Sequence, residues 1–156
     1  MDLLIRLCAD GLVVVIFIIA MVSFALKIPR DQWWSWGWRI VLGGLTAYLL
    51  AKIAGHFFQP ETLRPFEKLG VSPKAAFLPN PGFPSDHVLF ATFLSLAVWF
   101  STKQKKLAIT LLTLTVIMGV ARVLALVHTP LDVIGGFLIG CTSIVWYRRS
   151  SKNVVQ

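Results

Sequence analysis

The stretch of sequence that decides the fold reads LAITLLTLTVIMGVARVLALV, residues 107–127. A run of about 20 apolar residues is long enough to cross the hydrocarbon core of a bilayer as a helix. Four further apolar runs have similar lengths, at residues 3–26, 39–58, 84–100 and 130–147. Of the 156 residues, 56% are hydrophobic, more than the roughly 45–50% of an ordinary soluble domain. We therefore predict an all-α, polytopic integral membrane helix bundle with about five transmembrane helices.

Basic residues gather at alternate ends of these runs. The formal net charge of +8 would suggest a nucleic-acid partner in a soluble protein. Here the charges flank apolar runs, so we interpret them as determinants of topology and expect the bilayer, and no nucleic acid, as partner. The positive-inside rule places the clusters in the cytoplasm, with the N-terminus outside and the C-terminus inside. The three clusters are Lys27, Arg30 and Arg39; Lys103, Lys105 and Lys106; and Arg148, Arg149 and Lys152.

The five runs leave no room for a separate soluble domain, so residues 1–156 are expected to form a single membrane-embedded domain. The first run is too long for a cleaved signal peptide and is expected to be retained. Cys8 and Cys141 lack the spacing of a zinc or redox pair. Because the sequence also shows no cluster of metal ligands, we expect neither a metal nor a cofactor.

Two short motifs place polar residues at the ends of apolar runs. Pro84-Ser85-Asp86-His87 opens one run, and Arg122-x5-His128-x3-Asp132 joins the last two. Ionisable residues within or beside membrane spans usually have a functional reason. The arginine side chain ends in a planar, permanently charged guanidinium group, which can donate two parallel hydrogen bonds to a phosphate. A histidine followed by an aspartate four residues later can be an oriented nucleophile, and a second histidine can donate a proton.

The spacing resembles that of the type 2 phosphatidic acid phosphatase superfamily, which shares a fold with vanadium haloperoxidases. The family's last two motifs, P-S-G-H and S-R-x5-H-x3-D, correspond here to residues 84–87 and 121–132. Its first motif, K-x6-R-P, matches Arg64-Pro65 at its end, but Phe57 stands at the lysine position. A second register, Lys52-x6-Gln59-Pro60, keeps the lysine and loses the arginine.

The Pro-Ser-Asp-His form, together with Arg64-Pro65-Phe66, looks most like the small bacterial undecaprenyl-diphosphate phosphatases, and the resemblance spans about residues 48–140. It implies a metal-independent lipid phosphatase that forms a phosphohistidine and converts undecaprenyl diphosphate into undecaprenyl phosphate. The implied site consists of His128 as nucleophile, Asp132 as its orienting partner, His87 as proton donor, and Arg122, Arg64, Ser85 and Lys52 as phosphate-binding residues.

Counting the spans places both motifs and the region of Lys52 and Arg64 at the outer face. We therefore expect a multi-pass protein of the cell (inner) membrane whose active site faces the periplasm or the outside. Other substrates stay open, namely phosphatidic acid or phosphatidylglycerophosphate, and so does a non-catalytic lipid-binding or transport accessory role. The sequence also leaves open the oligomeric state, the first-motif register and the role of Asp86.

Local signals give further expectations. Pro84 is expected to be the first residue of its helix, with residues 85–87 in the first turn. Thr129 is expected to cap the last helix, with Pro130 as its first residue. In the long connection at residues 59–83, a short interfacial helix is expected at 61–69. Lys52 either binds phosphate or extends to the membrane surface. Arg6 and Asp10 are expected to form an ion pair within the first span, and their use in substrate binding is the alternative.

Overall fold

The structure is a computed structural model and describes residues 2–79 and 82–148. Every regular element in these two ranges is a helix. Four helical segments are long and apolar enough to cross a membrane, at Asp2–Lys27, Arg30–Phe57, Lys105–Leu124 and Pro130–Arg148. The remaining run forms α5 (Asp86–Thr102), which is shorter, with 17 residues. The prediction of a polytopic helical bundle is confirmed, with four long spans and a fifth, shorter apolar helix.

The spans consist of smaller elements. The first contains α1 (Asp2–Arg6), a π-helical turn η1 (Leu7–Gly11) and α2 (Leu12–Lys27), and the second contains the 3₁₀ turn η2 (Arg30–Gln32) and α3 (Trp33–Phe57). After α6 (Lys105–Leu124), the last span is divided into α7 (Pro130–Cys141) and α8 (Ile144–Arg148). At the division, the hydroxyls of Thr142 and Ser143 donate to the carbonyls of Ile139 and Gly140.

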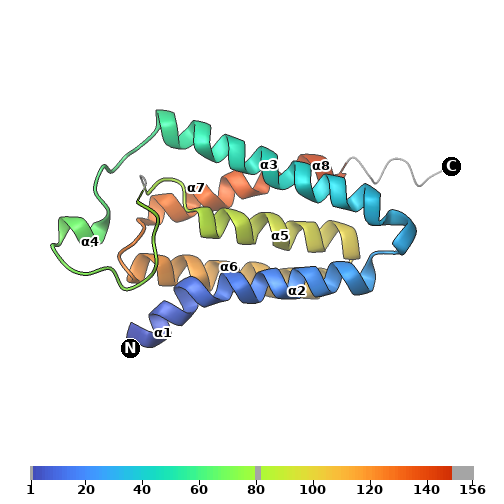
Figure 1. Cartoon of the computed structure of the whole chain (residues 1–156), viewed down its shortest axis with the longest axis horizontal. Coiled ribbons are helices and arrows are strands. Elements are labelled where there is room, and N and C mark those ends of the chain that lie inside the picture. The colour runs from blue at the N-terminus through green and yellow to red at the C-terminus, as the bar shows by residue number, and fades with distance from the viewer. Residues whose placement is uncertain (1, 80–81, 149–156) are drawn as a thin grey trace.

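Helix α5 lies at the centre of the bundle, packed against α2, α3, α6, α7 and α8 (Figure 1). Small residues such as Ala91 and Ala97, both fully buried, let its neighbours approach closely. The buried hydroxyls of Thr92 and Ser95 donate to carbonyls one turn earlier, so they leave no unpaired donor in an apolar environment. Its surrounded position explains why α5 can be shorter than the outer spans.

The outward faces of the other helices carry large apolar side chains, as expected for helices in contact with lipid. On α2, for example, Val14 and Ile18 are more than half exposed, and on α7 Leu138 is 61% exposed.

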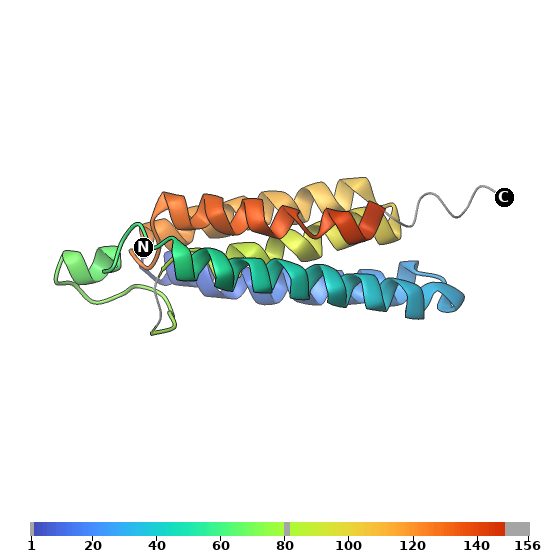
Figure 2. The same ribbon diagram turned by 90° about the horizontal axis from the view of Figure 1, so that it is seen from above.

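The two ends of the bundle differ in composition. One end holds α1, the connection between α3 and α5 with the short helix α4 (Pro65–Lys68), and the turn between α6 and α7 (Figures 1 and 2). We call it the site end. The opposite end, which we call the basic end, holds the α2–α3 turn, the α5–α6 turn and α8. It carries the basic clusters identified above, except that Arg149 and Lys152 lie outside the described residues.

Candidate active site

His128 and Asp132 are held together by the start of α7. As predicted, Thr129 caps this helix and Pro130 is its first residue: the Thr129 hydroxyl accepts from the Asp132 amide at 3.2 Å, and Asp132 Oδ2 accepts from the Thr129 amide at 2.7 Å. His128 Nδ1 lies 3.4 Å from the same oxygen, and both side chains are about 5% exposed. The distance is long for a hydrogen bond, and Oδ2 also accepts from Thr129. Nδ1 faces Asp132, so Nε2 is the nitrogen available for chemistry.

The surroundings of His128 keep its imidazole neutral. Burial lowers the pKa of His128 below its ordinary value of 6.5, and the positive charges of Arg122 and Arg64 act in the same direction, while Asp132 opposes them. Near pH 7 the ring is therefore unprotonated, which is the form that can attack an electrophile.

Arg122 is almost fully buried, with its side chain 1% exposed. Its Nη1 donates to Asp10 Oδ1 at 2.8 Å. The predicted ion pair between Arg6 and Asp10 is therefore wrong. The physical reason is the π-helical turn at Leu7–Gly11, since its wider winding removes the alignment of residues i and i+4 on which that prediction relied.

Arg64 is also buried, at 7% exposure, immediately before α4. Its Nη1 donates to the carbonyl of Val127, the residue before His128, and its Nη2 donates to the carbonyl of Leu78 at 3.2 Å. Burial lowers the pKa of Arg64 below its ordinary value, with the negative charge of Asp132 as the main opposing influence, but an arginine at neutral pH remains charged. The arginine of the Arg64-Pro65 register thus contacts the backbone next to His128. The predicted helix at 61–69 is shorter than expected and covers only Pro65–Lys68.

Ser85 is fully buried, and its backbone amide donates to the Asp132 carbonyl at 2.9 Å. This contact keeps Ser85 extended, so α5 begins at Asp86 with Ser85 as its N-cap. The prediction that Pro84 is the first helical residue is therefore wrong by two positions. The Ser85 hydroxyl and Arg122 Nε are buried polar atoms for which the described part of the chain offers no hydrogen-bond partner. Unpartnered groups of this kind are uncommon in proteins and suit a site that receives a polar ligand.

Glycines on α7 let the segment before α5 pack closely. A Cβ at Gly136 would lie 2.5 Å from the Ser85 carbonyl oxygen, and a Cβ at Gly135 would overlap the Phe83 ring. A Cβ at Gly82 would lie 3.0 Å from Asp132 Oδ2. These positions bring the Ser85 motif against the His128 motif.

Lys52, Asp86 and His87 stand together at one end of a cavity of about 590 Å³. Lys52 Nζ lies 3.8 Å from Asp86 Oδ2, and both side chains are more than a third exposed. His87 is near enough to Arg122 and His128 for their charges to act on it. The cavity continues away from the site end between α2, α3 and α5, where its lining is largely apolar: Val13, Gly44, Leu45, Tyr48, Leu89, Phe90 and Phe93. Leu78 of the α3–α5 connection also lines it.

The expected site residues thus fall into two adjoining groups. Arg64, Ser85, Arg122, His128 and Asp132 are buried and linked through the α6–α7 turn, whereas His87 and Lys52 border the cavity. Sequence reasoning missed the contact between Asp10 and Arg122. The signal available for it was an acidic residue inside an apolar span, which needs a partner of opposite charge. In the described part of the chain, no group of three or more His, Cys, Asp or Glu residues is placed to hold a metal ion.

Comparisons with known proteins identify the family of this chain. The family model of the PAP2 superfamily matches residues 32–156. A curated relative from Escherichia coli (strain K12), named "Putative undecaprenyl-diphosphatase YbjG", is 30% identical over 161 residues, which is 85% of this chain and 77% of the relative. No solved structure matches the chain. The match includes α3 to α8 and every expected site residue, so this chain belongs to the PAP2 superfamily, a family of phosphatases.

Proposed function

We propose that this protein is a metal-independent lipid diphosphatase that converts undecaprenyl diphosphate into undecaprenyl phosphate at the outer face of the cell (inner) membrane. The observation that carries the proposal is the position of the apolar cavity, which starts at His87 beside the buried arginine and histidine cluster. A site with this arrangement suits a substrate with a phosphate group at one end and a long hydrocarbon chain at the other. The relative's name supports the choice of undecaprenyl diphosphate.

In the first step, Nε2 of His128 attacks the terminal phosphorus of the diphosphate. The bond from this phosphorus to the bridging oxygen breaks, and His87 gives its proton to that oxygen, so undecaprenyl phosphate leaves. Asp132, opposite Nδ1, stabilises the positive charge that develops on the His128 ring. General acid catalysis of this kind contributes about 10²–10⁴-fold in rate.

In the second step, His87 takes a proton from water, the water oxygen attacks phosphorus, and the bond from phosphorus to His128 breaks. Inorganic phosphate is released and both histidines return to their starting forms. The transferred phosphoryl group carries negative charge on its equatorial oxygens throughout. Arg122 and Arg64 neutralise that charge, with the Ser85 hydroxyl as a further donor. Because two guanidinium groups supply positive charge, we propose that no metal ion is needed.

The test is phosphate release by purified protein in detergent, with EDTA present and no added metal, on undecaprenyl diphosphate, phosphatidic acid and phosphatidylglycerophosphate. We expect release from undecaprenyl diphosphate to be fastest. A preference for either glycerophospholipid would contradict the proposed substrate, and no release from any lipid would contradict the enzyme and favour a lipid-binding role.

A second measurement tests the intermediate. Rapid quenching with ³²P-labelled terminal phosphate should trap an acid-labile phosphoenzyme in the wild-type protein and none in His128→Asn. Asparagine is chosen because its amide nitrogen can occupy the place of Nδ1 beside Asp132 in a buried position. Wild-type turnover in His128→Asn would remove the phosphohistidine from the mechanism.

A further inference from the structure

Asp10 makes two contacts at the site end, one with each carboxylate oxygen. Oδ1 accepts from Arg122 Nη1 at 2.8 Å, and Oδ2 accepts from the backbone amide of Ala76 at 2.9 Å. Asp10 lies in η1, outside the range 32–156 that the family model matches. The family resemblance therefore assigns this residue no role. π-Helical turns occur often at functional sites, and here the turn faces α6, the helix that carries Arg122.

The contact with Asp10 uses only part of the Arg122 guanidinium. This group has five N–H donors in a fixed plane, and the only one that bonds to a described side chain is on Nη1. Nε is buried and unpartnered. Asp10 thus holds Nη1 of the guanidinium group and leaves the Nε–Nη2 edge available. That edge can bind two oxygens of a phosphate in parallel.

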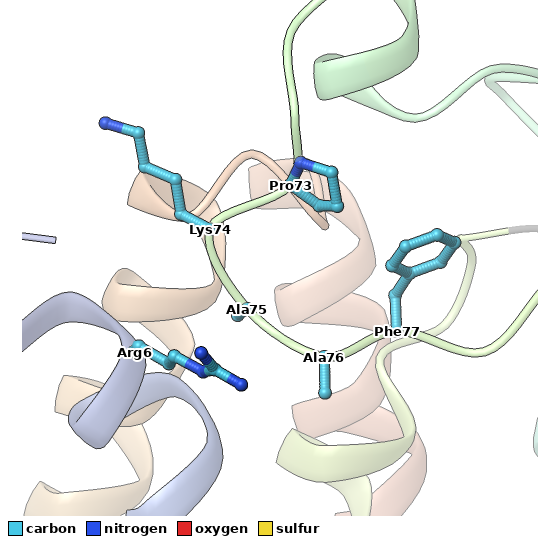
Figure 3. A pocket seen from close by; sticks show the side chains of 6 residues that line it. All are labelled: Arg6, Pro73, Lys74, Ala75, Ala76 and Phe77. Carbon is cyan, nitrogen blue, oxygen red and sulfur yellow. The ribbon is translucent and has the colours of Figure 1, made fainter. Parts of the chain in front are cut away.

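The second contact reaches the other arginine. Ala76, which donates to Asp10, is followed by Phe77, whose ring centroid lies 5.5 Å from the Arg64 guanidinium carbon, and by Leu78, whose carbonyl accepts from Arg64. Three consecutive residues therefore join Asp10, the partner of Arg122, to Arg64. Figure 3 shows this segment passing Arg6 of α1, with a cavity of about 340 Å³ between them. Because the segment is not packed tightly there, its bond to Asp10 matters for its position.

We propose that Asp10 is a positioning residue of the phosphate site: it holds Arg122 with its Nε–Nη2 edge toward the phosphate and fixes the Ala76–Leu78 segment against Arg64. This inference rests on the proposed role of Arg122 in phosphate binding. The first span thereby becomes part of the active site, although the family model begins only at residue 32.

In the alternative role, the Asp10 carboxylate competes with the substrate phosphate for the Arg122 guanidinium and is displaced when substrate binds. The geometry favours positioning, since Asp10 binds a single corner of the fork and its other oxygen is used by Ala76. The two roles predict opposite results. Removing a positioning residue weakens binding of an oxyanion, whereas removing a competitor strengthens it.

The experiment is a double-mutant cycle read out by binding of orthovanadate, an oxyanion that resembles phosphate. Dissociation constants are measured for the full-length wild-type protein in detergent and for Asp10→Ala, Arg122→Ala and the double variant. We expect Asp10→Ala to weaken binding about tenfold in the wild-type background, the order expected for one charge-assisted hydrogen bond. In the Arg122→Ala background the same change should have less than a twofold effect. A residue with a general structural role would cause equal losses in both backgrounds.

Asp2→Ala is the matched control, because Asp2 also pairs with this connection, through Lys74 Nζ at 3.0 Å, but has no contact with Arg122. It should bind orthovanadate as the wild type does. Asp10→Asn, which keeps the shape and an oxygen for Ala76, replaces Asp10→Ala if that variant does not fold, and should show a smaller loss with the same dependence on Arg122. Wild-type or tighter binding in Asp10→Ala, or equal losses in both backgrounds, overturns the proposal. If Arg122→Ala itself binds normally, the phosphate role of Arg122 is wrong and the proposed site fails with it.

Discussion

The backbone amide of Ser85 donates a hydrogen bond to the backbone carbonyl of Asp132 at 2.9 Å. This bond joins the two motifs, because it fixes the start of α5 against the first turn of α7. It is possible only because Gly136 has no side chain, since a Cβ there would lie 2.5 Å from the Ser85 carbonyl oxygen and 3.3 Å from the Leu89 amide nitrogen. Both atoms are backbone atoms, which cannot turn away as a side chain can.

Gly136→Ala should therefore separate the two motifs. We expect a loss of about 1–3 kcal/mol in the free energy of unfolding, as for other overpacked sites. We also expect a fall in kcat/KM of about 10²-fold, because a displacement of about 1 Å in an active site has that effect. Thermal unfolding in detergent and phosphate release measure the two effects. Gly37→Ala in α3, where a Cβ meets no atom within 4 Å, should change neither. Normal turnover in Gly136→Ala would mean that the motifs need not be in contact.

The pH dependence of turnover should report the protonation state of the His128 imidazole. Its pKa lies below 6.5 because of burial and the nearby arginines, so the reactive neutral form persists when the pH falls through 6.5. The acid limb of kcat/KM should lie below that pH. Asp132 raises the pKa of His128, so Asp132→Asn should move the acid limb to still lower pH while reducing the rate.

The substrate phosphate itself ionises near pH 6, so the substrate could also contribute to the acid limb. Comparing Asp132→Asn with the wild type removes this contribution, because it is the same in both reactions. Any difference between the two acid limbs therefore reports the ionisation of a group on the enzyme. A limb that moves to higher pH in Asp132→Asn would contradict the assignment of Asp132 as the partner of His128.

The first-motif register can be decided with two variants. Arg64 is 7% exposed and bonds to the carbonyl next to His128, whereas the Lys52 side chain is 46% exposed and faces Asp86. Arg64→Lys keeps the charge but loses the planar fork, and should lower kcat/KM by about 10²-fold or more. Lys52→Ala should lower it only a few-fold, as expected for an exposed ion pair. If Lys52→Ala is inactive and Arg64→Lys is normal, Lys52-x6-Gln59-Pro60 is the correct register.

Local signals allowed most of the helices and the His128–Asp132 pair to be predicted. The effects of Thr129 and Pro130 depend only on residues within one helical turn, so both the cap and the start of the helix can be predicted from the sequence. The start of α5 was missed because it depends on a bond from Ser85 to a residue in another helix. The partner of Asp10 lies 112 residues away, and only packing of the first span against α6 brings the two together. Long-range contacts of this kind leave no periodic signal.

The apolar cavity should determine how substrates with long tails are used. Leu45 lines the cavity, and Leu49, one turn further along α3, does not; both are about half exposed. Leu45→Trp should fill part of the cavity, so kcat/KM for undecaprenyl diphosphate should fall about tenfold, while that for a five-carbon prenyl diphosphate should change less than twofold. Leu49→Trp is the matched control and should leave both values unchanged. Equal losses for the two substrates in Leu45→Trp would indicate that the tail lies elsewhere.

The last prediction concerns the side of the membrane on which the site lies. The described residues of the basic clusters lie in or beside the α2–α3 turn, in or beside the α5–α6 turn, and at the end of α8. The α6–α7 turn and α4 lie at the opposite end of the bundle (Figure 1), so the positive-inside rule predicts that the site lies outside the cytoplasm. We test this with single cysteines at Ser72, which is exposed at the site end, and at Gln104, which lies in the α5–α6 turn and whose replacement removes no charge. Both are introduced into a Cys8→Ala, Cys141→Ala background. A membrane-impermeant thiol reagent should label position 72 in intact cells, with any outer membrane permeabilised, and position 104 only after lysis. Labelling in the reverse order would place the site in the cytoplasm. The enzyme could then not act directly on a lipid diphosphate that an extracytoplasmic reaction releases in the outer leaflet.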